Sequence, residues 1–313
     1  MLGENGRMGA AMTRRDVLAL GLGAAASVAM PARGFALGRF AVGNDELISI
    51  SDGGFTLPLA MALPGTPEDE LKALLAESGL PATQLTPDCN VTLLRRADGL
   101  TLFDAGAGPN FLSTTGRLFE GLNEAGIDPA DVTDVVFSHA HPDHLWGVLD
   151  DFDEIAFPNA AFHMAEAEIA FWTSDGAFAA LPEARQNFVP GARNRIDALG
   201  ERLQPIASGT PEVAGVEIVE TFGHSPGHLS FVVHGASEQY LIGGDAIMHP
   251  VISFAHPEWP YGPDQDPETA IATRQRLLDR LAADRTRLIG YHLPHPGEGI
   301  VERKDGAYRY ISG

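Results

Sequence analysis

Four residues of metal-ligand type stand within six positions of this sequence. The stretch 137–147 reads F-S-H-A-H-P-D-H-L-W-G, and its candidate ligands are His139, His141, Asp143 and His144. Imidazole nitrogens and a carboxylate together suit Zn, Mn, Fe or Co rather than Ca or Mg. Pro142 restricts the backbone between the second and third of these residues. The spacing therefore predicts a metal site.

Three more candidates, His224, Asp245 and His292, each follow a short apolar run that is expected to be a strand. Residues that follow strands in an α/β protein gather at one edge of the sheet. Seven ligands exceed the need of one tetrahedral ion, so the count favours two ions that share a bridging carboxylate. Two ions about 3.5 to 4 Å apart activate a shared water, which is hydrolytic chemistry.

Hydrophobic periodicity and turn signals predict the elements that position these residues. A hairpin is expected within residues 40–63, with its turn at Ser51-Asp52-Gly53-Gly54, followed by a helix that begins at Pro67 and lies over the sheet. A helix over 165–172 precedes a looping section that runs to Pro190. A long helix is expected over residues 267–283, and two further hairpins turn at Asp98-Gly99 and Asp305-Gly306. This order indicates one layered α/β domain.

Composition excludes several classes of protein. The 313 residues carry 42 acidic and 21 basic side chains, for a net charge of −21. Nucleic-acid binding relies on clusters of Lys and Arg, so a nucleic-acid partner is not expected. The only cysteine, Cys89, rules out an intramolecular disulfide and a multi-cysteine metal site, and we expect it to be a small buried residue beside a strand. The sequence leaves a homodimer open.

The first 36 residues have the pattern of an export signal. Arg14-Arg15 precede an apolar run over 17–30, and small residues near Ala36 offer a cleavage site. The paired arginines are typical of a twin-arginine-like signal. The apolar run is shorter than the roughly 20 residues of a membrane span, so no span is expected. The prediction is a periplasmic or secreted protein.

The order and context of the candidate ligands resemble the metallo-β-lactamase superfamily over essentially the whole chain after the leader. The resemblance is carried by His139-Ala140-His141-Pro142-Asp143-His144, Gly223-His224-Ser225-Pro226-Gly227-His228, Gly244-Asp245 and His292. Within it, the chain is most similar to methyl parathion hydrolase and lactonase-like relatives, through Asp104-Ala105-Gly106-Ala107, Phe157-Pro158-Asn159-Ala160 and His292-Leu293-Pro294-His295-Pro296-Gly297. The resemblance implies a four-layered αββα sandwich for residues 37–313.

The resemblance also implies which residue holds which ion. One divalent ion would be held by His139, His141 and His224, the other by Asp143, His144 and His292, with Asp245 bridging the two. Zinc is the first choice, with Mn, Fe and Co as options. A metal-bridging hydroxide would be the nucleophile, and Asp143 is a candidate for passing a proton. His228 is expected to orient a ligand rather than to bind metal.

The resemblance further points to a substrate pocket beside the metals. Phe111, Trp172 and Phe188 fall in segments that could line it, although ordinary core positions explain such aromatic residues as well. His295 departs from the pattern of the parathion-degrading relatives, which have an aromatic residue in the closing motif, and it could bond to substrate or compete for metal. The remaining histidines, His163, His234, His249 and His256, are expected to be core or surface residues, with His249 and His256 as the first exceptions to consider because they follow Asp245 closely.

The function predicted from these residues is a binuclear hydrolase of a small neutral substrate, namely a lactone, an aryl ester or an organophosphate triester. Three alternatives stay open. They are a mononuclear-iron oxidoreductase on the same fold, a true β-lactamase, and a metal-binding protein without turnover. The complete set of Asp143, His144 and His292 argues against the oxidoreductase, because one iron would not need all three.

Overall fold

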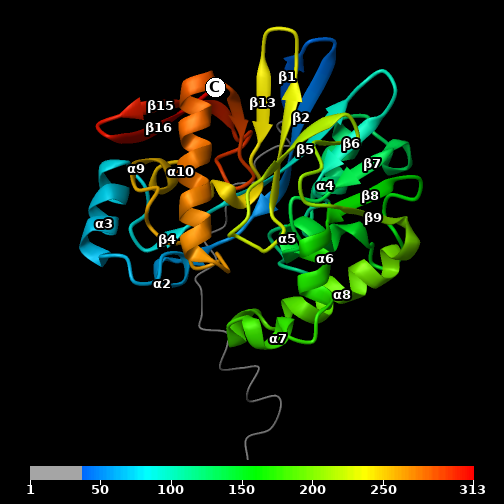
Figure 1. Ribbon diagram of the computed structural model, residues 1–313, viewed down its shortest axis with the longest axis horizontal. Helices are drawn as coiled ribbons and strands as arrows, with labels where there is room; N and C mark the ends of the chain where they lie inside the picture. The colour runs from blue at the N-terminus through cyan, green and yellow to red at the C-terminus, as the bar shows by residue number, and fades with distance from the viewer. Residues whose placement is uncertain (1–36) are drawn as a thin grey trace, which may run out of the picture. The chain divides into compact units, whose positions relative to one another are not determined.

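The computed structural model describes residues 37–313 (Figure 1). The export signal predicted over residues 1–36 lies outside the described residues. Within residues 37–313 we find no helix with both the length and the apolar character that a membrane crossing requires.

Two seven-stranded sheets form the middle of the structure. The first mixes antiparallel pairs at one side with three parallel pairs at the other. Its order is β1 (Gly38–Val42), β2 (Asp45–Gly54), β5 (Asp88–Arg95), β6 (Leu100–Phe103), β7 (Asp134–Val136), β8 (Ala161–Ala165) and β9 (Leu203–Ile206).

The second sheet is antiparallel apart from the parallel pair that β13 and β14 form. Its order is β10 (Glu212–Val213), β11 (Val216–Glu220), β12 (Leu229–His234), β13 (Gln239–Ile242), β14 (Arg287–Ile289), β15 (Glu298–Lys304) and β16 (Ala307–Ser312). The parallel pair needs a crossover, which is supplied by α10 (Pro267–Asp284). This helix begins as expected, with Pro267 in its first turn and the Asp266 carboxylate accepting from Thr269 N.

The two sheets pack face to face, and helices cover both outer faces. On β12, Phe231 and Val233 point into the core between the sheets while Val232 packs under α10, because successive strand residues face opposite sides. Phe103 of the first sheet meets Phe231 of the second at a ring distance of 5.1 Å. The outer face of the first sheet is covered by α4 (Leu118–Glu124), α6 (Glu166–Thr173) and α8 (Phe188–Leu199). The fold is the predicted four-layered αββα sandwich (Figure 1).

Shorter elements complete the chain. A two-stranded sheet is made by β3 (Leu57–Pro58) and β4 (Gln84–Leu85). The short helices are α2 (Leu59–Ala62), α5 (Pro142–Leu145), α7 (Ala177–Ala180) and α9 (Ile252–Ala255), together with five single 3₁₀ turns, η1 to η5, at residues 129–131, 146–148, 183–185, 200–202 and 244–246. The hairpins predicted at Asp98-Gly99 and Asp305-Gly306 are confirmed.

The hairpin turn predicted at Ser51-Asp52-Gly53-Gly54 is wrong. The turn lies at Gly43-Asn44, and β2 continues to Gly54 with a shift of register after Ser51. The reason is Asp52, whose buried carboxylate accepts the backbone N–H groups of Ala107, Gly116 and Leu118. Asp52, which the sequence suggested as a turn residue, is therefore a strand residue that holds the distant loop 104–118 against the sheet.

Two further predictions need correction, one on where a helix packs and one on where a loop ends. The helix after Pro67, α3 (Glu68–Glu77), does not lie over a main sheet, because Leu71 and Leu75 pack into a separate cluster with Trp259 and Tyr261. The looping section expected up to Pro190 already contains the start of α8, which buries Val189. Long-range packing decides both cases, and local periodicity does not report it.

Replacement of Asp52 by Ala should destabilise the protein. The change leaves three backbone N–H groups without their carboxylate acceptor, and buried unpaired donors are costly, so we expect a loss of about 2 to 4 kcal/mol in the free energy of unfolding. Urea unfolding followed by circular dichroism measures it. Asp98→Ala, at an exposed turn residue, is the matched control. An unchanged midpoint for Asp52→Ala would contradict the assigned role.

Candidate metal centre

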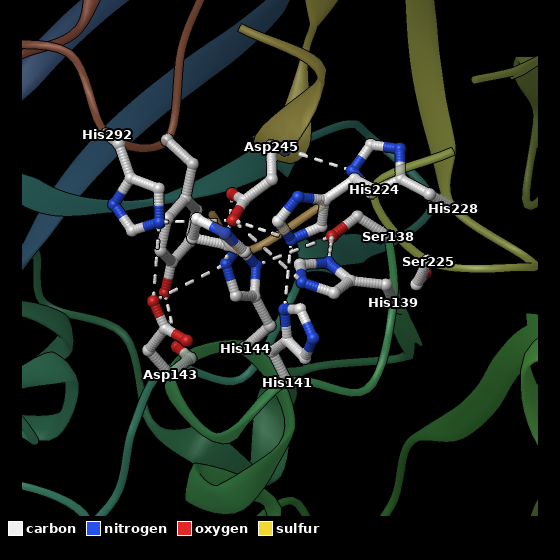
Figure 2. Close-up of polar contacts among 12 residues, drawn as sticks. Ser138, His139, His141, Asp143, His144, His224, Ser225, His228, Asp245 and His292 are labelled. Carbon is white, nitrogen blue, oxygen red and sulfur yellow. Dashed lines mark hydrogen bonds and ion pairs between the residues drawn. The ribbon is translucent and has the colours of Figure 1, made fainter. Parts of the chain in front are cut away.

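The seven predicted ligands lie together at the ends of strands from both sheets. His139 and His141 follow β7, and Asp143 and His144 lie on α5, which begins with Pro142. The remaining three follow strands of the second sheet, with His224 after β11, Asp245 after β13 and His292 after β14. Figure 2 shows their side chains converging from separate loops. The expected gathering at one edge is what the structure shows.

The carboxylate of Asp245 lies at the middle of the group. Its Oδ2 atom is 3.2 Å from Nε2 of His224 and 3.2 Å from Nε2 of His292. Its Oδ1 atom is 3.1 Å from Nε2 of His144. Asp143 lies to one side, with Oδ2 3.4 Å from Nε2 of His292. Asp245 therefore has the position of a residue shared between two sets of donors.

Donor atoms in this centre are buried without ordinary partners. The Nε2 atoms of His139 and His141 have no hydrogen-bond partner among the described residues, although each is closed off from solvent. Buried polar atoms in folded proteins are nearly always paired, so a cluster of unpaired ones needs an explanation. Imidazole nitrogens gathered around a buried carboxylate fit a divalent metal ion. The residues present therefore fit metal binding.

The donors divide into groups of which two share Asp245. His139, His141, His224 and Asp245 offer ligand atoms within 4.8 Å of one another, and so do His144, Asp245 and His292. A third group adds an unexpected residue, because Cys89 lies with Asp143 and His292. Cys89 is buried on β5 as predicted. Burial, then the nearby carboxylates, raise the pKa of its thiol well above the ordinary value, which disfavours the thiolate that metals bind.

Electrostatics make the centre receptive to positive charge. Burial lowers the pKa of His139 and of His141 well below the ordinary value, so both imidazoles are neutral and free to bind metal. Burial opposes ionisation of Asp245, yet the neighbouring imidazoles of His292 and His144 hold its pKa well below the ordinary value. Its carboxylate is therefore ionised at the centre of the cluster.

Most of the imidazoles are held from behind by an oxygen atom on their other nitrogen. Nδ1 of His144 is 2.8 Å from Oδ2 of Asp104, and Nδ1 of His224 is 2.9 Å from Oδ1 of Asp264. Nδ1 of His292 is 2.8 Å from the backbone oxygen of Asp88. Such contacts fix the tautomer and leave Nε2 for the metal.

The sequence analysis did not predict that Asp104 and Asp264 hold metal-ligand imidazoles. Asp104 stood in the quoted Asp-Ala-Gly-Ala motif and could have been found, whereas Asp264 belongs to no motif and only the fold brings it to His224.

Glu168, a fully buried residue of α6, joins the two ligand loops, and the sequence did not single it out. Its Oε1 atom accepts from Ala140 N, between His139 and His141, and from Trp172 Nε1. Its Oε2 atom accepts from Ser225 Oγ and Gly227 N, just after His224. A Cβ atom at Gly227 would lie 2.4 Å from Glu168 N, so this close approach requires glycine. One buried carboxylate thus positions both loops.

A largely apolar cavity of about 240 Å³ opens beside the ligands. His141, Asp143, Asp245 and His292 reach it from the metal centre. Its other walls are Phe55, Thr56, Leu57, Met61, Leu85, Pro87, Phe111, Leu112, Ala184, Arg185, Phe188, Met248, His249, Tyr261 and Pro263.

Of the four predicted pocket residues, two line the cavity and two do not. Phe111 and Phe188 line the cavity, with ring centroids 6.4 Å apart. Trp172 is fully buried away from the lining, where its indole N–H bonds to Glu168. His295 does not line the cavity either, because its Nδ1 lies 2.7 Å from Asn90 Oδ1 and its backbone N–H donates to Asp88. The cavity therefore takes Phe111 of its aromatic wall from the loop 104–118 and Phe188 from α8, beside Phe55 and Tyr261.

Two other histidines that the sequence singled out have separate surroundings. His228 accepts the backbone N–H of Asp245 on Nε2, at 2.9 Å, so it holds the loop that carries the central carboxylate. His256 is partly exposed, stacks on Trp259 and pairs with Glu258. Among the described residues, His256 is absent from both the metal groups and the cavity lining.

Comparisons with known proteins agree with this geometry. The family model described as the metallo-beta-lactamase superfamily matches residues 86–299. The structure is similar to AidC, described as a dizinc quorum-quenching lactonase in complex with an acyl-homoserine product, with 28% identity, 89% of this chain and 98% of that chain covered, and a TM-score of 0.84. It is similar to the hydrolase AbOPH of the beta lactamase superfamily, with 25% identity, 90% and 98% covered, and a TM-score of 0.83.

A more distant likeness concerns the fold alone. A probable metal-dependent hydrolase from Staphylococcus aureus has 19% identity, with 88% of this chain and 99% of that chain covered and a TM-score of 0.71. No curated protein sequence matches the chain.

Glu168→Gln should weaken metal binding. The amide replaces an acceptor oxygen with a donor where all the partners donate, so the loops that carry His141 and His224 lose their common support. Loss of such supporting contacts costs about 10- to 100-fold in metal affinity. Competition with a chromophoric zinc chelator measures the change. Glu166→Gln, at an exposed residue of the same helix, is the control, and equal affinities for the two variants would refute the role.

Proposed function

This chain belongs to the metallo-β-lactamase superfamily, and on that premise we propose that it is a binuclear zinc hydrolase whose substrate is a lactone with an apolar side chain. Aryl esters and organophosphate triesters are the other members of the proposed substrate class. The observation that carries the proposal is Asp245, a buried carboxylate shared by two groups of metal donors beside an apolar cavity.

The residues divide between the two ions around Asp245. His139, His141 and His224 would hold one, and His144 and His292 the other, with Asp143 beside His292. Bound there, divalent ions supply Lewis-acid chemistry, in which they lower the pKa of a water molecule and polarise an ester carbonyl. The relative AidC, described as dizinc, supports two zinc ions in this fold.

The chain's own residues bind the substrate and exclude water. The walls of the cavity are mainly aromatic and aliphatic, so an apolar chain gains from burial there. Asp143 reaches the cavity from the side of His292, and this position supports the proposal that it takes up or passes on a proton. A neutral lactone meets no electrostatic barrier from the acidic surface of the protein. The acyl-homoserine product described with AidC supports this substrate class.

Metal content and turnover should fail together when a ligand is removed. We expect about two zinc equivalents in the purified protein, and His141→Ala should lose metal and reduce acyl-homoserine lactone turnover by at least about 100-fold. Elemental analysis and a lactonase assay on the same sample measure both. His234→Ala, at an exposed histidine on β12, should behave as wild type. A single iron with consumption of oxygen would instead identify an oxidoreductase.

Chain-length preference should depend on Phe188. Phe188→Ala removes an aromatic wall of the cavity, so the KM for a decanoyl lactone should rise about 10-fold while that for a butanoyl lactone changes little. Steady-state kinetics on the two substrates measure the difference. Phe152→Ala provides the same substitution at a side chain that is 84% exposed and outside the cavity. Equal effects on both lactones would place the apolar chain elsewhere.

A further inference from the structure

His249 lies in the cavity wall next to the metal centre, and nothing in the metal site uses it. It follows the turn that carries Asp245 and precedes the short helix α9. The residue is 8% exposed and lines the same cavity as Asp143, Asp245 and His292. Among the described residues, His249 belongs to none of the metal-donor groups. His249 is therefore a cavity-lining imidazole whose function the metal centre does not explain.

The backbone determines which ring nitrogen of His249 carries the proton. The N–H groups of Val251 and Ile252 both donate to Nδ1, at 3.2 Å and 3.1 Å. Because Nδ1 accepts, the single proton of a neutral imidazole must lie on Nε2. Nε2 has no partner within residues 37–313, and it is not among the buried atoms sealed from solvent. His249 therefore has one donor without a partner among the described residues, on a side chain that lines the cavity.

Ser253 holds the backbone of the same segment. Its Oγ atom accepts the N–H groups of Met248 and His249, both at 3.1 Å, and lies 2.9 Å from the hydroxyl of Tyr261. The side chain of His249 thus accepts hydrogen bonds from the backbone that follows it, and the side chain of Ser253 accepts them from the backbone that precedes it. Together these bonds hold the segment 248–253. The position of the Nε2 donor is fixed before a substrate arrives, as an effective catalytic donor requires.

The imidazole is also neutral under ordinary conditions. Burial lowers the pKa of His249 to about 4. A neutral imidazole cannot deliver a proton as an imidazolium ion does, but it can donate a hydrogen bond to a carbonyl oxygen that gains negative charge. The geometry and the charge state thus favour a donor of hydrogen bonds over a general acid.

We propose that Nε2–H of His249 donates a hydrogen bond to the carbonyl oxygen of the scissile ester and stabilises the negative charge that develops there. The proposal rests on the proposed hydrolase function and adds a catalytic residue to it. When water attacks the carbonyl carbon, the electron pair of the C=O bond moves to this oxygen. His249 keeps its proton throughout, so the leaving oxygen must obtain its proton from elsewhere.

Two substitutions distinguish the role of the Nε2–H donor of His249 from the role of its Nδ1 acceptor, which binds the backbone. Asn in place of His249 offers an oxygen near the position of Nδ1, so it keeps the acceptor for Val251 and Ile252 but removes the donor. Gln offers an N–H near the position of Nε2, so it keeps the donor but loses that acceptor. We expect His249→Asn to reduce kcat by about 100-fold with little change in KM, and His249→Gln to retain most of the activity.

The reverse order of activities would overturn the proposal, because it would mean that His249 only supports the backbone. Zinc content is measured on every variant and should stay equal to that of wild type. A thiolactone keeps the carbonyl oxygen and replaces the leaving oxygen with sulfur, so His249→Asn should lower its turnover by the same factor. An unaffected thiolactone would assign the donor to the leaving oxygen and contradict the proposal.

Nitrogen-15 NMR of the imidazoles provides a reading that does not depend on activity. We expect His249 to show a proton on Nε2 and none on Nδ1 from pH 8 to pH 6, and to become protonated only near its pKa of about 4. A proton on Nδ1 would overturn the proposal. If the zinc-loaded wild type hydrolysed no lactone, aryl ester or phosphotriester, the proposed function would fail, whatever tautomer NMR showed.

Discussion

A buried, ionised carboxylate surrounded by imidazole nitrogens is the interaction on which the rest of the structure depends. Asp245 is 3% exposed, and burial of an isolated carboxylate is strongly unfavourable. Nε2 atoms of His144, His224 and His292 lie within 3.2 Å of its oxygens, so the cost is offset by positive charge, whether protons or metal ions. The same arrangement leaves Nε2 of His139 and of His141 without a hydrogen-bond partner among the described residues. Metal binding satisfies these atoms and the carboxylate together.

Such a cluster requires support from many parts of the chain. Asp104 follows a strand of the first sheet, Glu168 lies on a covering helix and Asp264 precedes the crossover helix of the second sheet. Each of these carboxylates accepts hydrogen bonds from a metal-donor imidazole or from the loops that carry one. Arg274, itself buried, donates to Asp264 and to two backbone oxygens, so the support extends a further layer outward. The sandwich therefore acts as a rigid frame for the donors.

The cavity beside the donors suits the neutral substrates that we propose for this acidic protein. Its walls are largely apolar, and the substrates proposed for it are neutral, so the net charge of −21 does not oppose their entry. Within this apolar wall His249 provides a neutral donor whose tautomer is determined by backbone N–H groups. Hydrogen bonds are stronger in an apolar environment than in water, which is why one fixed donor can matter there.

The sequence by itself determined the seven candidate ligands, their order after strands and a layered α/β domain, because ligand spacing and hydrophobic periodicity are local properties, and the family resemblance of the motifs added the αββα arrangement. Only the tertiary structure decided that Asp52 extends a strand, that Trp172 and His295 lie outside the cavity, and that Glu168 joins two ligand loops. These assignments depend on contacts between residues far apart in the chain. Side-chain type and local pattern are the same whether such a partner is present or not, so no local signal reports them.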